Sequence, residues 1–184
     1  MGGAIGGAPH LHLTTIRMTR PRLFIAGWPP EQVASQLAHL VGAAETGVRW
    51  VPAHDLHVTL RFLGSADEDA VSEGLVATDL PVAQARLGPA VTLFSSEVVM
   101  VPVAGLDELV LAVSAATADC GSPPDPRPFV GHLTLGRLRR GARSGLIGVP
   151  VSALFAVDEV SLVSSTLTQS GPNYRILRRF PCRG

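Results

Sequence analysis

Two histidines of this sequence recur in the same tetrapeptide. His57-Val58-Thr59-Leu60 and His132-Leu133-Thr134-Leu135 share the pattern His-x-Thr-Leu, and both lie in apolar runs typical of strands. Side chains alternate across a strand, so each histidine projects from the same face as the threonine two positions later. The apolar members of each motif then point into the core. Each motif therefore presents one imidazole beside one hydroxyl.

If the two strands lie close together, they form a pocket with two imidazoles and two hydroxyls. Thr59 and Thr134 can donate hydrogen bonds to a bound phosphate. One histidine can accept the proton of an attacking water, and the other can protonate a departing ribose oxygen. Histidine suits both tasks because its unperturbed pKa of ~6.5 lets both protonation forms exist near neutrality. These residues thus indicate opening of a cyclic phosphodiester.

This chemistry requires no metal and no other cofactor, and we expect neither. Zinc at the two histidines is a weaker interpretation, because zinc takes three or four protein ligands in most sites. No cysteine or third histidine accompanies the two motifs.

Composition favours a packed protein with a small binding footprint. The chain has 184 residues, of which 46% are hydrophobic and 16% charged, which fits one medium domain or two small lobes that share a core. The formal net charge is zero, which argues against a broad nucleic-acid or membrane footprint. A protein that grips only a terminal phosphate and one or two nucleotides needs no such footprint.

The sequence also suggests where the protein acts. No apolar run approaches the ~20 residues needed to span a membrane, and Cys120 and Cys182 form no motif. We therefore expect free thiols, a cytoplasmic location and a monomer. Residues 1–17 are rich in glycine and lack a signal-peptide pattern, so we expect a flexible extension there, with Met18 as the native start. Residues 18–184 are expected to form a single domain.

Apolar patterning predicts an α+β order of elements, because strands are interrupted by single helices. A strand, a helix and a motif-bearing strand occur in this order twice, which is a weak internal repeat. Two similar halves would place the motif strands side by side about a pseudo-twofold axis. The predicted strands are 23–26, 56–63, 91–94, 98–103, 129–138, 155–164 and 174–180, and the predicted helices are 33–41, 65–75 and 106–113.

The chain resembles the 2H phosphoesterase superfamily, and within it the bacterial and archaeal RNA 2′,3′-cyclic phosphodiesterases, also called 2′-5′ RNA ligases. The resemblance runs from Arg22 to about Phe180. Two of its segments contain the histidine motifs. The segments that carry it are 22–26, 49–52, 56–64, 128–137, 165–167 and 171–174.

This resemblance implies a bilobal α+β fold. Each of two pseudo-twofold-related lobes would have an antiparallel sheet with helices outside, and a central cleft would lie between the sheets. It also implies hydrolysis of RNA 2′,3′-cyclic phosphate ends to 2′-phosphomonoesters without a cofactor. By the same resemblance, His57 is the proton donor to the 3′ leaving oxygen and His132 is the proton acceptor.

Further site residues follow from the resemblance. Arg137 matches an arginine that the family uses near the phosphate. Strict alternation puts it on the face opposite His132, so it reaches the site only if the strand bulges, for example at Gly136. Arg61 has the parity of the first motif histidine and is a candidate substrate contact. Phe62 matches a family aromatic position and is either a substrate contact or a core residue.

One residue departs from the family pattern. A proline usually precedes the second motif histidine, and Gly131 stands there in this chain. Glycine permits the backbone turn but restrains it less. We therefore expect the second motif to be less rigid than the first.

Three alternatives stay open for the function. The first keeps the chemistry but changes the substrate to a small cyclic nucleotide, an ADP-ribose cyclic phosphate or a 2′-5′-linked oligonucleotide. The second is reversible 2′-5′ ligation, in which a 5′-hydroxyl takes the place of water. The third is a module that binds RNA ends without catalysis. The expected partner is thus an RNA with a 2′,3′-cyclic phosphate terminus or a small cyclic nucleotide, and no membrane is involved.

Overall fold

Strands dominate the part of the chain that the computed structural model describes, which is residues 22–41, 45–168 and 171–184. The expected extension over 1–17 lies outside these residues. The strands are β1 (Arg22–Gly27), β2 (Val48–Trp50), β3 (Val58–Gly64), β4 (Ala83–Leu87), β5 (Thr92–Phe94), β6 (Val98–Ala104), β7 (His132–Leu138), β8 (Ala153–Val157), β9 (Glu159–Thr168) and β10 (Gly171–Pro181). The helices are α1 (Glu31–Val41), α2 (Glu68–Val76) and α3 (Asp107–Ala116), with a 3₁₀ turn η1 (Ala53–Asp55).

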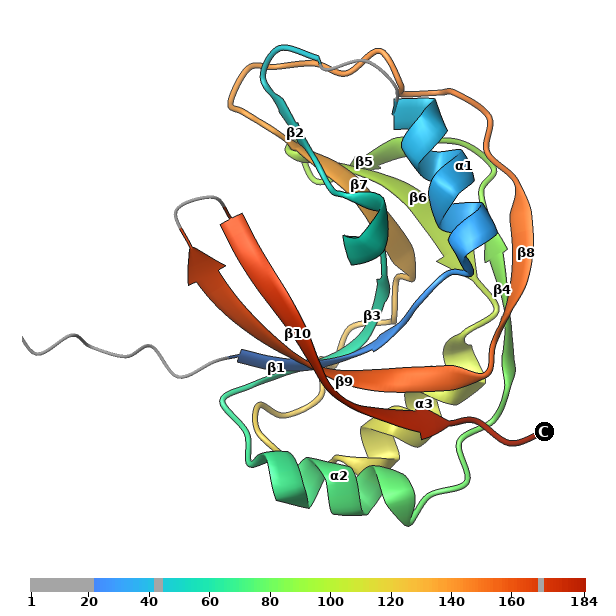
Figure 1. Cartoon of the computed structure of the whole chain (residues 1–184), viewed down its shortest axis with the longest axis vertical. Coiled ribbons are helices and arrows are strands. Elements are labelled where there is room, and N and C mark those ends of the chain that lie inside the picture. Colours follow the sequence, from blue (N-terminus) through green and yellow to red (C-terminus); the bar gives the residue numbers. More distant parts are fainter. Residues whose placement is uncertain (1–21, 42–44, 169–170) are drawn as a thin grey trace, which may run out of the picture.

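The strands pair antiparallel in the order β10-β9-β1-β3-β7-β6-β4-β8, with β2 added beside β7 and β5 beside β6. Figure 1 shows that this sheet curls into an open half-barrel. In one half, α2 contacts β10 and α3 contacts β3. Helix α1 lies toward the other half (Figure 1). The predicted α+β class with two antiparallel lobes is confirmed, and the two lobes join into one curled sheet. Within the described residues, no helix is long and apolar enough to cross a membrane.

The internal repeat corresponds to a symmetric strand arrangement. The units β1-α1-β3 and β6-α3-β7 place their strands in the order β1-β3-β7-β6. Strands β3 and β7 meet at one antiparallel pair, Val58 with Leu133, and each of these residues directly follows a motif histidine. Both side chains are fully buried in the main core. The two histidines therefore flank the pseudo-twofold axis.

Strand β3 bulges within its motif. Thr59 pairs with Ala26 of β1, and Arg61 pairs with Ile25, so Leu60 has no partner in β1. An extra residue reverses the alternation of side chains beyond it. Simple alternation predicts that Arg61 shares the face of the first motif histidine, but Arg61 instead turns to the side on which Ile25 enters the main core.

Arg61 joins β3 to the end of α3. Its side chain is only 5% exposed. One terminal nitrogen donates hydrogen bonds to the carbonyl oxygen of Ser114 at 2.9 Å and to the hydroxyl of Thr117. The other donates to the carbonyl oxygens of Ser122 at 3.2 Å and Cys120 at 3.4 Å. A cation is favoured at a helix C-terminus, where carbonyl groups lack intrahelical donors. Arg61 is thus part of the scaffold rather than of the cleft.

One predicted strand is wrong as a single element. The run 155–164 divides at Asp158 into β8 and β9. The division is required because β8 pairs with β4 in one half of the sheet, whereas β9 pairs with β1 and β10 in the other. Strand β4 was not predicted from the apolar pattern.

We predict that Arg61→Met lowers the free energy of unfolding by about 2–4 kcal/mol, because several buried acceptors lose their donor. Urea unfolding measures this loss. Arg179→Met is the matched control, since Arg179 forms an exposed ion pair with Glu159, and it should cost no more than ~1 kcal/mol. Equal losses in the two variants would contradict a structural part for Arg61.

Candidate active site

Both motifs open onto one cavity of about 330 Å³. Five of the seven residues predicted for the site line it, namely His57, Thr59, His132, Thr134 and Arg137. The threonines and histidines arrive there because they share the concave face of β3 and β7 on either side of the pseudo-twofold axis. Two predicted residues do not line this cavity: Arg61 is buried below the sheet, and the half-exposed Phe62 lies beyond it.

Arg137 reaches the cavity through a second bulge. Thr134 pairs with Met100 of β6 and Gly136 pairs with Val99, so Leu135 is the unpaired residue. The bulge lies next to the position suggested by the sequence. It returns Arg137 to the face of Thr134. Both bulges follow their motif histidine by three positions, so the two halves deform alike.

Each motif histidine is oriented by a backbone carbonyl. Nδ1 of His57 lies 2.7 Å from the carbonyl oxygen of Asp55, and Nδ1 of His132 lies 2.8 Å from that of Val130. A carbonyl oxygen only accepts hydrogen bonds, so Nδ1 carries the proton and donates in both cases. Nε2 is then the nitrogen that can take up or release a proton. The bond spans two residues in both halves, which repeats the symmetry of the scaffold.

Aromatic rings enclose His57. Its ring centroid lies 5.1 Å from that of Phe24, 5.2 Å from that of Trp28 and 5.1 Å from that of Tyr174. These rings come from β1, from the residue directly after β1, and from β10. They shield the imidazole from water, and this apolar environment makes the protonated form of His57 more costly.

Burial accordingly lowers the pKa of His57 below 6.5. The hydrogen bond to the Asp55 carbonyl and the nearby Asp55 carboxylate raise this pKa, but by less than burial lowers it, and the charge of His132 lowers it further. His57 is therefore mostly neutral at pH 7 in the free protein. A bound phosphate anion would raise its pKa, because an opposite charge favours the protonated form.

His132 lies in a more open environment. Its hydrogen bond to Val130 is solvent-exposed, whereas that of His57 is partly buried. Phe94 of β5 stacks on one face of its ring, with centroids 4.8 Å apart and planes inclined by 11°. The two imidazoles therefore share a backbone anchor but differ in access to water.

Gly131 lies directly against the backbone of β6. The amide of Val103 donates to the carbonyl oxygen of Gly131 at 2.8 Å. A Cβ on Gly131 would lie 2.3 Å from the carbonyl oxygen of Val103, so only glycine lets the two backbones approach this closely. The lower rigidity of the second motif stays a prediction, and in the structure β6 contacts the backbone directly before His132.

The cavity also contains residues to which the sequence assigned no part. Arg49, Trp50, Asp55 and Tyr174 all line it. Arg49 faces Arg137 across the β2–β7 pair. Burial raises the pKa of the Tyr174 hydroxyl, while the two nearby arginines oppose this shift. The segments 49–52 and 171–174 belonged to the family resemblance, which was the available signal. Among the described residues, no three His, Cys, Asp or Glu side chains gather as a metal site.

Known proteins resemble this chain over most of its length. Residues 28–81 match the sequence model of the LigT-like phosphoesterases. An RNA 2′,3′-cyclic phosphodiesterase of Thermus thermophilus is 31% identical over 191 residues, which cover 89% of this chain and 91% of the relative. The chain belongs to the LigT-like phosphoesterase family. An RNA 2′,3′-cyclic phosphodiesterase of Methanocaldococcus jannaschii is 26% identical, with 86% of this chain and 99% of the relative covered.

Solved structures of LigT-like phosphoesterases share the fold. E. coli LigT in complex with 3′-AMP superposes with a TM-score of 0.73 at 27% identity, over 90% of this chain and 99% of that chain. A protein of Thermus thermophilus also gives a TM-score of 0.73 at 27% identity, over 89% and 98% of the two chains. This chain is thus a phosphoesterase of the 2H superfamily.

We predict that His57 titrates below pH 6.5 in the free protein, which an NMR titration of the histidine ring signals measures. Trp28→Ala should raise the midpoint toward 6.5, because water reaches the imidazole. Phe94→Ala is the matched control, since Phe94 stacks on the other histidine, and it should leave the His57 midpoint in place. A free-protein midpoint at or above 6.5 would contradict the enclosure of His57.

The same shift affects stability in acid. The pKa of His57 is lower in the folded chain than in the unfolded chain, so the unfolded chain binds protons more readily. The contribution of neutral His57 to stability is therefore present above about pH 6.5 and is lost as the pH falls through the folded pKa.

Proposed function

We propose that this LigT-like phosphoesterase hydrolyses 2′,3′-cyclic phosphate ends of RNA to 2′-phosphomonoesters. The observation that carries the proposal is the single cavity in which two carbonyl-anchored imidazoles, two threonine hydroxyls and Arg137 meet. The names of the Thermus and Methanocaldococcus relatives support the same substrate class.

In the proposed reaction, water attacks phosphorus and the P–O3′ bond breaks. The general base takes one proton from the water, and the general acid gives one proton to O3′, so that a 2′-phosphate and a 3′-hydroxyl result. Because His57 and His132 flank the pseudo-twofold axis, they approach a bound phosphate from two sides, as attack and departure in line require. Each proton transfer contributes typically 10²–10⁴-fold to the rate.

We assign the donor to His57 and the acceptor to His132. The open side of the cavity beside His132 admits the attacking water. His57 must be protonated to act as the acid, although burial lowers its pKa. The anionic substrate itself supplies the charge that favours protonation, so the acid forms when the phosphate binds.

Thr59, Thr134 and Arg137 are proposed to hold the phosphate. A guanidinium gives charge-assisted hydrogen bonds to phosphate oxygens, and two hydroxyls add neutral ones. These donors and the two proton transfers account for the reaction without a metal ion, and the cysteines Cys120 and Cys182 take no part in it.

A small cyclic nucleotide is the second candidate substrate. The cavity of about 330 Å³ has the size of a small-ligand site, and E. coli LigT was crystallised with 3′-AMP. Ligation of a 5′-hydroxyl in place of water would use the same groups in reverse. We also propose that the protein acts as a monomer. Both cysteines are free, as is usual in the reducing cytoplasm where we propose that it acts.

We predict that His57→Ala and His132→Ala each lower kcat about 10²–10⁴-fold on an RNA oligomer with a 2′,3′-cyclic phosphate end. The double variant should lose less than the product of the single losses, because the two groups act on one phosphate. His54→Ala is the matched control, since the His54 side chain is 80% exposed and does not line the cavity. If either motif histidine proves dispensable, the two-histidine scheme is wrong.

We also predict that the hydrolysis rate is unchanged after exhaustive treatment with a chelator such as EDTA. The physical reason is that the two imidazoles supply both proton transfers, while the threonines and Arg137 bind the phosphate anion. Activity that disappears with the chelator and returns with a divalent cation would contradict the metal-free scheme while leaving the site in place.

A further inference from the structure

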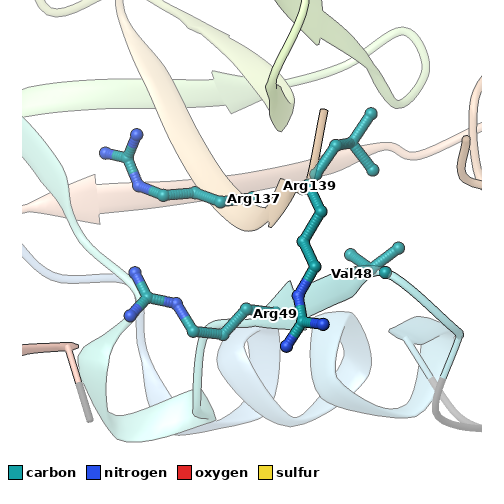
Figure 2. Close-up of a pocket in the computed structure, with 6 residues that line it drawn as sticks. Val48, Arg49, Arg137 and Arg139 are labelled. Carbon is teal, nitrogen blue, oxygen red and sulfur yellow. The ribbon is translucent and has the colours of Figure 1, made fainter. Parts of the chain in front are cut away.

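A second hollow of about 470 Å³ adjoins the histidine cavity. Arg49 and Arg137 line both, so the two hollows share a wall. Figure 2 shows the side chains of Arg49 and Arg137 extending toward the same side, while that of Arg139 runs down toward β2. The lining residues are Gly47, Val48, Arg49, Arg137, Leu138 and Arg139. Among the described residues, three arginines and no acidic side chain line this hollow.

The arginines continue the catalytic face of β7. His132 and Thr134 lie on this face, and the bulge at Leu135 returns Arg137 to it. Arg139 follows two residues later, about 7 Å further along at ~3.3 Å per residue. Its backbone is fixed, because its amide donates to the carbonyl oxygen of Gly47 at 2.8 Å. One strand face thus carries the proposed proton acceptor His132 and then Thr134, which can donate a hydrogen bond to the phosphate. The guanidinium groups of Arg137 and Arg139 follow on the same face.

The charges of Arg137 and Arg139 are available to a ligand. Within the parts of the chain that the structure describes, neither Arg137 nor Arg139 forms an ion pair. The whole chain has a formal net charge of zero, so this cluster is a local excess of positive charge. Guanidinium groups fit phosphate oxygens by paired hydrogen bonds. A phosphate group is therefore the ligand that the hollow suits best.

We propose that Arg139 binds the phosphodiester on the 5′ side of the terminal nucleotide, beside Arg137, which holds the cyclic phosphate. This rests on the proposed function, which places the cyclic phosphate between the histidines. In RNA the nearest second anion lies one ribose away, at the 5′ oxygen of the same nucleotide. An RNA strand that enters the site along β7 brings this second phosphate to Arg139. The substrate is then an RNA end with at least one internucleotide phosphate, and a bare nucleoside cyclic phosphate leaves the subsite empty.

Calorimetric titration of two product-like ligands tests this subsite without turnover. Adenosine 2′-monophosphate occupies the histidine cavity alone, whereas adenosine 2′,5′-bisphosphate adds the second phosphate. The wild type should bind the bisphosphate about tenfold more tightly, as expected for a charge-assisted contact. Arg139→Ala should abolish this preference, and Arg139→Lys should restore part of it. Arg140→Ala is the matched control: it removes the same charge one residue further on, outside the hollow, and should keep the preference.

Each outcome separates the subsite from the proposed function. Equal affinity of the wild type for the two ligands, or a preference that survives Arg139→Ala, would overturn the subsite while the proposed function stands. Failure of both ligands to bind would overturn the proposed function as well. In turnover, the salt dependence supplies a second readout. The slope of log kcat/KM against log salt for an RNA oligomer should become less steep by about 0.7 in Arg139→Ala, because one phosphate contact is lost.

Discussion

The antiparallel contact between Val58 of β3 and Leu133 of β7 is the constraint on which the site depends. These two residues lie at the pseudo-twofold axis, and each is preceded by a motif histidine. Their burial in the core fixes the register of both strands. A slip by one residue would turn either histidine to the opposite face of the sheet. Because this pair joins β3 to β7, the hydrophobic core sets the distance between the two motif histidines.

A symmetric scaffold carries asymmetric surroundings in this protein. The bulges occupy equivalent positions, so the residue five places after each histidine faces the concave side: it is Phe62 in one half and Arg137 in the other. The two motif histidines are also enclosed to different extents. Tyr174 and two further rings surround His57, whereas His132 has one stacked ring and open access. The proposed acid and base require different environments, and β10 beside His57 and β5 beside His132 contribute to that difference.

The sequence predicted the residues of the two motifs, because alternation over three residues and the buried Val58 and Leu133 determine where His57, Thr59 and their counterparts point. It failed at Arg61, because a bulge at Leu60 leaves no mark in an apolar run. Arg137 was placed correctly only by assuming a bulge. Arg49 and Tyr174 enter the cavity from β2 and β10, whose positions depend on pairing between distant segments. No local pattern specifies such pairings, which is also why the break between β8 and β9 was not predicted.

The bulge at Leu135 makes the pairing of this segment with β6 more important than the side chain of Leu135. A different apolar residue at this position would keep the backbone path, since the bulge is defined by the count of residues between Thr134 and Gly136. A strand with the same residues but no bulge would alternate simply and turn Arg137 and Arg139 away from the cleft together, whereas removing Leu135 would straighten the strand and leave both arginines on the face of Thr134. The bulge therefore absorbs one residue of β7, and the pairing with β6 on both sides of it keeps the arginines on the same face as the histidine.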